Sequence, residues 1–168
     1  MMLDIAIEAD PEWDSSSRWE TLIRSAAEAA IAESAFPQLG QTDRPVELSV
    51  RLTGDDEVKT LNARWRFKDK PTNVLSFPQC QPDELDRIAP AGPELMLGDI
   101  VLARGVCERE AEEKGVPLEE HATHLLVHGT LHLLGYDHQD DGSAEDMESR
   151  EIRALERLGI SDPYRISD

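Results

Sequence analysis

The sequence predicts one α+β domain in which a small mixed sheet of about four strands is packed by about five helices. Three observations carry this prediction. Four short segments suit strands, five longer segments have apolar residues at helical spacing, and a length of 168 residues suits one domain. A chain near this length buries about 70% of the surface that it exposes when unfolded, so it needs no disulfide framework. We therefore treat residues 1–168 as a single domain.

The strands are predicted from alternating apolar residues and from short apolar runs between turn residues. The clearest strand is residues 46–52, where valines and leucines alternate with polar residues. A proline-bearing loop, residues 78–93, separates the last two strands. The remaining predicted strands are residues 3–7, 73–77 and 97–102.

The helices are predicted from apolar residues three and four positions apart, which is the spacing of an amphipathic helix. Gly115 and Gly135 close two of them, because glycine readily takes the left-handed conformation that ends a helix. Pro117 suits the first turn of a helix, and the side chain of Ser143 can cap the last helix, which ends at Gly159. The five segments are residues 19–31, the stretch opened by Gly54 and Asp55, and residues 104–114, 118–134 and 143–158.

Composition excludes several classes of protein. With 17 Lys and Arg against 35 Asp and Glu the formal charge is −18, yet 39% of the residues are hydrophobic, which is too many for a disordered chain. No stretch approaches the roughly 20 apolar residues of a membrane span, and the acidic first residues are unlike a signal peptide. We expect a cytoplasmic protein with no membrane partner. Cys80 and Cys107 form no C-x-x-C pair, so we expect reduced, structural thiols.

One basic segment interrupts this acidic chain. Residues 59–70 contain five Lys and Arg side chains and one aspartate, a local charge of +4. The aromatic side chains in and after this segment, Trp65, Phe67 and Phe77, can stack on unpaired bases, but at 5% aromatic content we expect them to pack in the core. Positive charge of this kind suits phosphate groups.

All five histidines lie between residues 121 and 138. His128 and His132 are one helical turn apart, so both rings lie on one face and can share one ion. Gly135 can end the helix and turn the chain so that His138 approaches the pair. Three histidines bind zinc at about 2.0–2.1 Å and leave a fourth position for water, which is typical of a catalytic site. Such a metal lowers the pKa of its bound water toward roughly 7 and polarises a substrate oxygen.

Two other histidines and one glycine limit this interpretation. We expect His121 to be a core or exposed residue, whereas three roles are open for His124: a fourth ligand, an outer-shell partner of the ligands, or a core residue. The spacing of the three ligands is that of the metzincin proteases, so we predict a metzincin-like histidine helix. In those proteases a glutamate base follows the first histidine, and here this position is Gly129. The spacing therefore suits the metal and not the protease chemistry.

Two blocks of sequence resemble the YbeY family of bacterial metal-dependent endoribonucleases. One is HGTLHLLGYDH at residues 128–138, and the other is RFKDKPTNVLSFP at residues 66–78. Weaker support comes from Leu97 to Ile100 and from Asp162 to Tyr164. The resemblance spans roughly residues 61–164.

This resemblance implies a zinc endoribonuclease that cleaves single-stranded RNA in maturation of the small-subunit ribosomal RNA 3′ end and in ribosome quality control. It implies one zinc ion on His128, His132 and His138, and it assigns a catalytic role to Arg66, whose guanidinium can bind a phosphate with two donors. Lys68 and Lys70 can hold neighbouring phosphates. The expected partners are single-stranded RNA, the ribosome, and a ribosomal protein or assembly GTPase.

Two alternatives to this function are open from the sequence. One is a metal-dependent hydrolase of another substrate, and the missing glutamate argues against its protease form. The other is a non-catalytic ribosome assembly factor whose zinc only stabilises the fold, which a fourth ligand at His124 would favour. The charge of −18 also opposes RNA binding. We therefore expect a local positive cleft, formed by the metal and the basic segment, in an otherwise repelling surface.

Overall fold

The computed structural model describes residues 3–13, 17–40, 45–80, 85, 94–137 and 140–164. Its four strands form one mixed sheet in the order β1-β2-β4-β3. The strands β1, β2 and β4 run parallel, and β3 pairs antiparallel with β4 at one edge. Their bounds are β1 Leu3–Ala9, β2 Val46–Thr53, β3 Val74–Pro78 and β4 Leu95–Ala103. The prediction of a small mixed sheet is confirmed.

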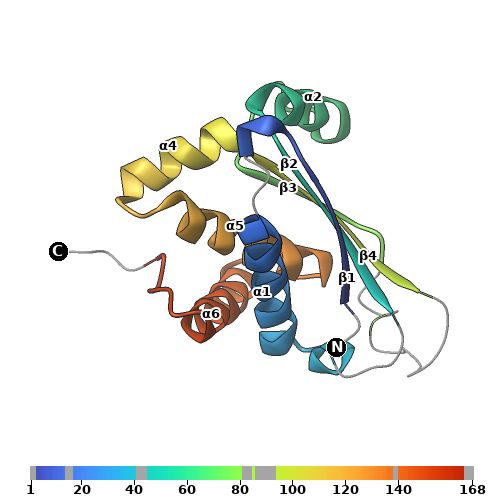
Figure 1. The fold of residues 1–168 in the computed structure, drawn as a ribbon. Coiled ribbons are helices and arrows are strands. Elements are labelled where there is room, and N and C mark those ends of the chain that lie inside the picture. The colour runs from blue at the N-terminus through green and yellow to red at the C-terminus, as the bar shows by residue number, and fades with distance from the viewer. Residues whose placement is uncertain are drawn as a thin grey trace.

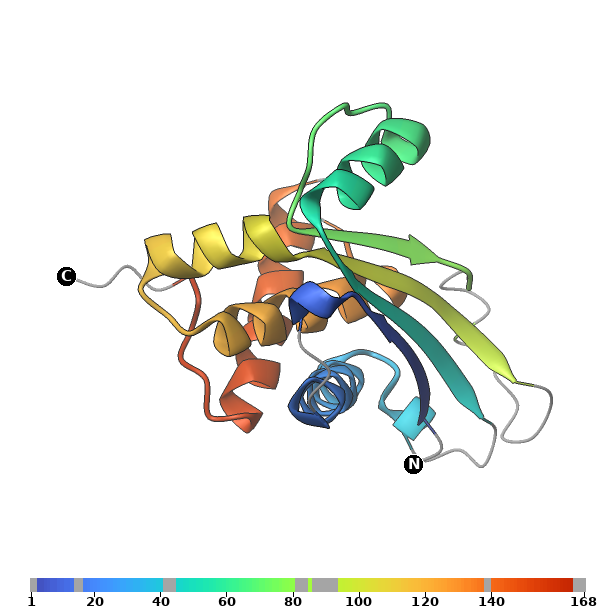
Figure 2. The same ribbon diagram turned by 45° about the horizontal axis from the view of Figure 1, so that its top comes forward.

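Helices lie on both faces of this sheet, in unequal numbers. Figure 1 shows α1, α5 and α6 on one face, and Figure 2 shows α2 standing over one end of the opposite face. Within the described ranges the structure contains five α-helices, as predicted for an α+β domain. They are α1 Ser17–Glu33, α2 Asp55–Arg66, α4 Arg104–Lys114, α5 Leu118–Leu133 and α6 Asp141–Arg157. None of the described helices is long and apolar enough to cross a membrane.

The alternation of β2 explains why one face of the sheet carries most of the helices. Its four apolar side chains are buried in the main core, whereas Glu47, Ser49 and Arg51 point to the more open face. A second, smaller core lies under α2, where Val58 packs with Leu75, Val101 and Ala103. Burial of apolar area therefore fixes both faces of the sheet.

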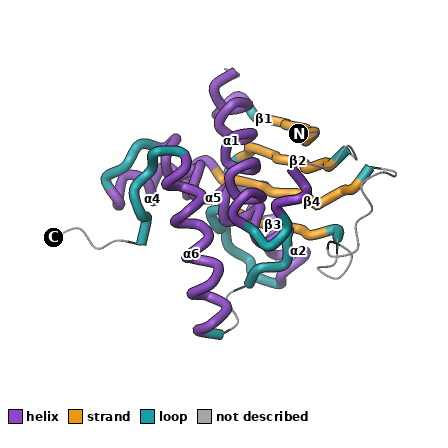
Figure 3. Tube along the Cα trace, turned by 90° about the horizontal axis from the view of Figure 1, so that it is seen from below, coloured by secondary structure: helices purple, strands orange, loops and turns teal. Residues whose placement is uncertain are grey.

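The helix α5 is the centre of the main core. It contacts α1, α4, α6, β3 and β4, and eleven of its sixteen residues are buried. Figure 3 shows it among the helices gathered on one side of the sheet. A helix packed on nearly every side has little freedom to shift, so it holds its polar side chains in fixed positions.

Three side chains differ from the predictions. The side chain that caps α6 is Asp140, whose carboxylate accepts from the backbone N–H of Ser143, so the predicted cap at Ser143 is wrong. An acidic cap is favoured there because it also meets the positive end of the helix dipole. Trp65 and Phe67 are exposed and do not pack in the core, where they were expected.

The loop predicted at residues 78–93 lies mostly outside the described residues. Cys80 and Cys107 are buried and form no disulfide, as expected. Burial raises the pKa of Cys107 to about 12, so this thiol stays protonated at neutral pH.

Candidate metal centre

Two histidines of α5 meet at a single point. His128 and His132 are one turn apart, and their Nε2 atoms are 3.0 Å from each other. Two nitrogens bound to one tetrahedral zinc ion at about 2.0–2.1 Å lie roughly 3.3 Å apart. The two side chains are therefore arranged as a pair of ligands to one ion.

The opposite nitrogens of both rings have fixed acceptors. His128 Nδ1 is 2.5 Å from the carboxylate of Glu151, and His132 Nδ1 is 2.8 Å from the backbone carbonyl of Tyr136. These acceptors take the Nδ1 hydrogens, so the Nε2 lone pairs of the two rings face each other. Two lone pairs at 3.0 Å repel unless a cation or a proton lies between them. The donor set therefore fits a bound metal ion.

Glu151 is a buried carboxylate that the sequence analysis did not identify. It lies on α6, is 0% exposed, and accepts a second hydrogen bond, 2.6 Å long, from the hydroxyl of Tyr164. Burial alone raises the pKa of Glu151, but interactions with His124, His128 and Tyr164 lower it to about 2. The carboxylate is therefore charged at neutral pH and can accept the ring hydrogen of His128.

A signal for Glu151 is visible in the sequence. It lies four residues after Met147 and four before Leu155, on the buried face of α6. A charged residue within an apolar helical stripe needs a polar partner in the core. That partner could not be chosen from local pattern, because the contact joins residues that are 23 positions apart.

His124 and His121 lie beside this pair, away from its Nε2 atoms. His124 Nε2 is 3.2 Å from the Tyr164 hydroxyl and 3.7 Å from Glu151, on the side of His128 that carries Nδ1. His121 is buried, and its Nε2 is 2.8 Å from Glu110. In this structure His124 is thus an outer neighbour of the pair, and His121 is a hydrogen-bonded core residue.

His138 lies outside the described residues. Gly135 has a φ of 100°, which is the left-handed turn predicted after α5. Within the described part of the chain, no three His, Cys, Asp or Glu side chains form a metal-binding group. The third ligand therefore stays a prediction, and the observed centre consists of two of the three expected histidines.

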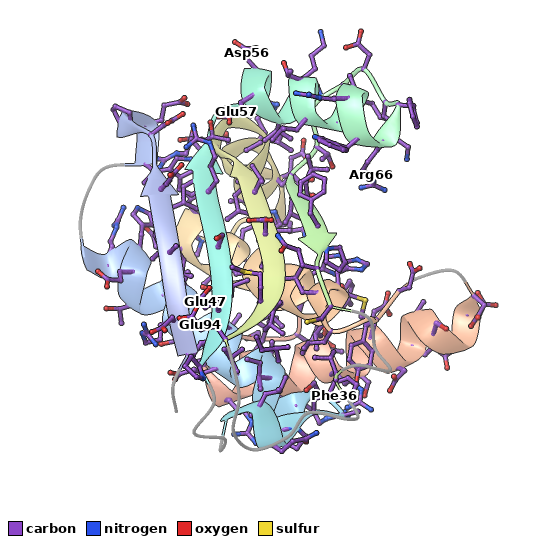
Figure 4. All side chains as sticks on the ribbon, turned by 90° about the vertical axis from the view of Figure 1, so that its right-hand side faces the viewer. Phe36, Glu47, Asp56, Glu57, Arg66 and Glu94 are labelled. Carbon is purple, nitrogen blue, oxygen red and sulfur yellow. The ribbon has the colours of Figure 1, made fainter. Side chains whose placement is uncertain are left out.

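Arg66 and the two histidines line the same cleft. This cleft has a volume of about 620 Å³ and is also lined by Ser76, Tyr136 and other residues of β3 and of the turn after α5. Figure 4 shows the Arg66 side chain extending below the end of α2, in the direction of β3 and α5. The nearby Lys68 and Lys70 do not share this position. Both are exposed, and neither is among the described residues that line the cleft.

Gly129 allows α5 to approach the sheet closely. A Cβ atom at this position would lie 3.1 Å from Ser76 Oγ and 3.2 Å from two carbons of Ile100. The position next to the first ligand therefore faces the packed interface with β3 and β4. A glutamate there has no room to reach the histidines, which gives a physical reason for the missing protease base.

One cleft thus contains a histidine pair that can bind a metal and an arginine that can bind phosphate. This combination suits a hydrolase that acts on phosphate esters. The family model described as "Endoribonuclease YbeY" matches residues 6–159. The protein named endoribonuclease YbeY of Rhizorhabdus wittichii is 52% identical over 168 residues, which covers 99% of each chain. Its namesake in Agrobacterium fabrum is 47% identical over 96% of this chain and 95% of its own.

A solved structure agrees with these comparisons. The solution structure of TM1509 from Thermotoga maritima matches with a TM-score of 0.54 and 25% identity, and the match covers 98% of this chain and 100% of that one. The chain therefore belongs to the YbeY family of endoribonucleases. Membership confirms the predicted resemblance and the predicted class of enzyme, a hydrolase acting on phosphodiester bonds.

Gly129→Glu is expected to lower the free energy of unfolding by about 3 kcal/mol or more, because the larger side chain overpacks the interface and buries a charge. Urea unfolding followed by circular dichroism measures this change. Gly142→Glu, on the exposed first turn of α6, is the matched control and is expected to change it by less than about 0.5 kcal/mol. Equal stability of the two variants would contradict the packing role.

Glu151→Gln is expected to weaken binding of a divalent metal by about 10–100-fold, because the neutral amide no longer holds the Nδ1 hydrogen of His128 as a charged acceptor. Competition with a chromogenic chelator gives the affinity. Glu156→Gln, which removes the same charge from an exposed position of α6, is the control. If both variants bind metal like the unaltered chain, Glu151 does not support the ligand.

Proposed function

We propose that the chain is a zinc-dependent endoribonuclease that cleaves single-stranded RNA, with one zinc ion on His128, His132 and His138. The observation that carries the proposal is the convergence of the His128 and His132 Nε2 atoms, 3.0 Å apart, in the cleft that Arg66 also lines. Metal ligands and a phosphate-binding group can then act on one bound phosphate. Membership of the YbeY family supports the phosphodiester as that substrate.

Each side chain of the cleft has a distinct task in this proposal. The zinc ion, when bound, supplies a Lewis acid and lowers the pKa of water. Arg66 binds the scissile phosphate and stabilises the negative charge that grows on it during cleavage. Asp137 is the carboxylate among the described lining residues and is the candidate for moving a proton to or from the substrate.

The charges of the described lining residues support RNA binding within an acidic chain. Arg66 and Asp137 are the charged side chains among them, apart from the two histidines, so the bound metal makes the cleft net positive. The remaining acidic surface opposes RNA binding elsewhere. We infer that targeting depends on a partner, for which a ribosomal protein or an assembly GTPase is the expected class.

The finer role follows from the same family resemblance. We propose that the substrate is the 3′ end of the small-subunit ribosomal RNA and that the enzyme takes part in ribosome quality control. Lys68 and Lys70, which are exposed just beyond Arg66, are proposed to contact neighbouring phosphates. The expected cytoplasmic location stays a prediction.

Two observations weigh against the alternatives. A purely structural zinc would need a fourth protein ligand, and His124 interacts with Tyr164 and Glu151 on the other side of His128. A peptide hydrolase would need a base next to the first ligand, and Gly129 faces Ser76 and Ile100 there. Both contacts therefore favour a nuclease over a structural zinc site or a peptide hydrolase.

His132→Ala is expected to lose bound zinc and RNA cleavage together, because one Nε2 of the pair is removed. Metal analysis and a cleavage assay on single-stranded RNA, with the product ends mapped, measure both. Chelation of the unaltered chain gives the same loss, and added zinc restores its activity. A variant that still cleaves RNA after exhaustive purification contradicts the proposal.

Arg66→Ala is expected to lower the cleavage rate by about 100-fold while zinc content stays unchanged, because the phosphate loses its charged donors. Lys59→Ala removes the same charge from an exposed position of the same helix and is the matched control. RNA affinity should fall as salt rises, and less steeply in Arg66→Ala. An Arg66 variant that cleaves RNA as fast as the Lys59 variant removes Arg66 from the mechanism.

A further inference from the structure

Two large aromatic side chains are exposed on either side of Arg66 in the sequence. Trp65 is 60% exposed and Phe67 is 91% exposed, whereas the other two tryptophans, Trp13 and Trp19, are buried. Single exposed apolar residues are common, but two large aromatic ones beside a functional arginine mark an interaction surface. We call the pair formed by Trp65 and Phe67 the aromatic pair.

Phe67 occupies a backbone position that usually favours glycine. It ends α2 with a φ of 58°, in the left-handed region, and its N–H donates to the carbonyl of Asn62. Any residue with a Cβ is less stable than glycine in this conformation. The chain therefore places an aromatic side chain here against local backbone preference, and almost all of that side chain faces solvent. Packing within the fold does not account for it.

The end of α2 separates two cavities. Arg66 lines the cleft of the histidines, whereas Trp65 lines a second cavity of about 750 Å³ on the open face of the sheet. The edge strand β3 has the same alternation, because Ser76 faces the first cavity and Phe77 faces the second. An extended chain leaving the histidine cleft at this edge therefore meets Trp65 first, whereas Phe67 lies beyond the end of α2, outside the described lining of both cavities.

Charge decides which kind of chain fits this surface. Figure 4 shows Asp56 and Glu57 at the far end of α2 from Arg66, so the helix is acidic at one end and basic at the other. Lys68 and Lys70 follow the basic end and are exposed. Phosphates are favoured at this end, next to the aromatic pair.

The second cavity limits how far a polyanion can extend. Its described lining includes Glu8, Glu57 and Asp99, and Arg51 is held by ion pairs to Glu8, Asp10 and Glu57. This part of the sheet repels phosphate groups. The favourable path for phosphates therefore stays at the basic end of α2 and does not continue into the second cavity.

Trp65 also has a face that can stack. The guanidinium carbon of Arg64 lies 5.4 Å from the centroid of the Trp65 ring, so a cation covers part of the ring, while 60% of the residue is exposed and can meet a flat partner. Stacking on such rings does not depend on base identity, because every base has a flat face. It does depend on an unpaired base, because the faces of paired bases are already stacked in a duplex.

We propose that the aromatic pair is a stacking platform for one or two unpaired bases next to the phosphate that Arg66 binds. The inference rests on the proposed function and adds to it a physical source of single-strand selectivity. A duplex cannot present an open base face to Trp65 and Phe67. A single strand can, while its phosphates stay at Lys68 and Lys70.

The test compares two double variants that differ in ring content. Trp65→Leu with Phe67→Leu keeps apolar side chains and removes both rings, whereas Trp65→Tyr with Phe67→Tyr keeps two rings. Affinities are measured with a chelator present, which prevents cleavage, for a short single-stranded oligoribonucleotide and for an abasic strand of equal length. We expect the leucine variant to bind the oligoribonucleotide about tenfold more weakly, the tyrosine variant to bind it like the unaltered chain, and the abasic strand to bind all three equally.

A second variant keeps the test independent of folding defects. Phe67→Gly is expected to unfold at a temperature at least as high as the unaltered chain, because glycine suits the left-handed position, and yet to bind the oligoribonucleotide more weakly. Trp65 is the exposed tryptophan of the chain, so its fluorescence is expected to be quenched by the oligoribonucleotide and not by the abasic strand.

The outcomes separate this inference from the proposed function. If the leucine variant binds RNA as tightly as the tyrosine variant while the unaltered chain cleaves RNA through Arg66, the platform is wrong and the nuclease stands. If the unaltered chain neither binds nor cleaves single-stranded RNA, both fail. Equal weakening for the abasic strand also overturns the platform, because it would indicate a lost phosphate contact.

Discussion

The hydrogen bonds at Nδ1 of His128 and His132 are the constraint on which the candidate site depends. Each ring has one nitrogen tied to a fixed acceptor, a carboxylate of α6 in one case and a backbone carbonyl after α5 in the other. The remaining nitrogens must then face each other at 3.0 Å. A metal ion resolves the repulsion between them, so the fold prepares the site before any ion arrives.

The rest of the architecture holds these groups in place. α5 packs against β3 and β4 through Gly129, α6 supplies Glu151 from the buried face, and Tyr164 holds the second oxygen of that carboxylate. α2 is on the opposite face of the sheet, but its last residue reaches the same cleft at the β3 edge. Elements from both faces of the sheet therefore meet at one point on its edge.

Local patterns in the sequence were sufficient for much of this arrangement. Apolar alternation located the strands, and the spacing of His128 and His132 placed the two rings on one helical face. These two predictions succeeded because the backbone fixes the repeat of a strand and the repeat of a helix. The partner of Glu151 was not predictable, since it depends on how α6 docks on α5. Exposure of Trp65 and Phe67 was missed for a similar reason: average burial of aromatic residues does not apply where the helix ends above an open edge.

Two disagreements between local preference and structure are informative. The sequence suggested Ser143 as the cap of α6, and Asp140 takes this role because the helix begins two residues earlier. At Phe67 the conflict is larger, since a left-handed backbone carries an aromatic residue that is 91% exposed, so burial offsets little of its cost. Violations of this kind concentrate where a protein contacts its ligands.

The most direct test of the account is the tautomeric state of the two histidines. Long-range nitrogen–proton NMR spectra of the metal-free chain should show His128 and His132 protonated at Nδ1, and added zinc should shift both Nε2 signals together. Protonation at Nε2 in both rings, or zinc binding that leaves these signals unchanged, would contradict the claim that the fold directs the pair toward one metal ion.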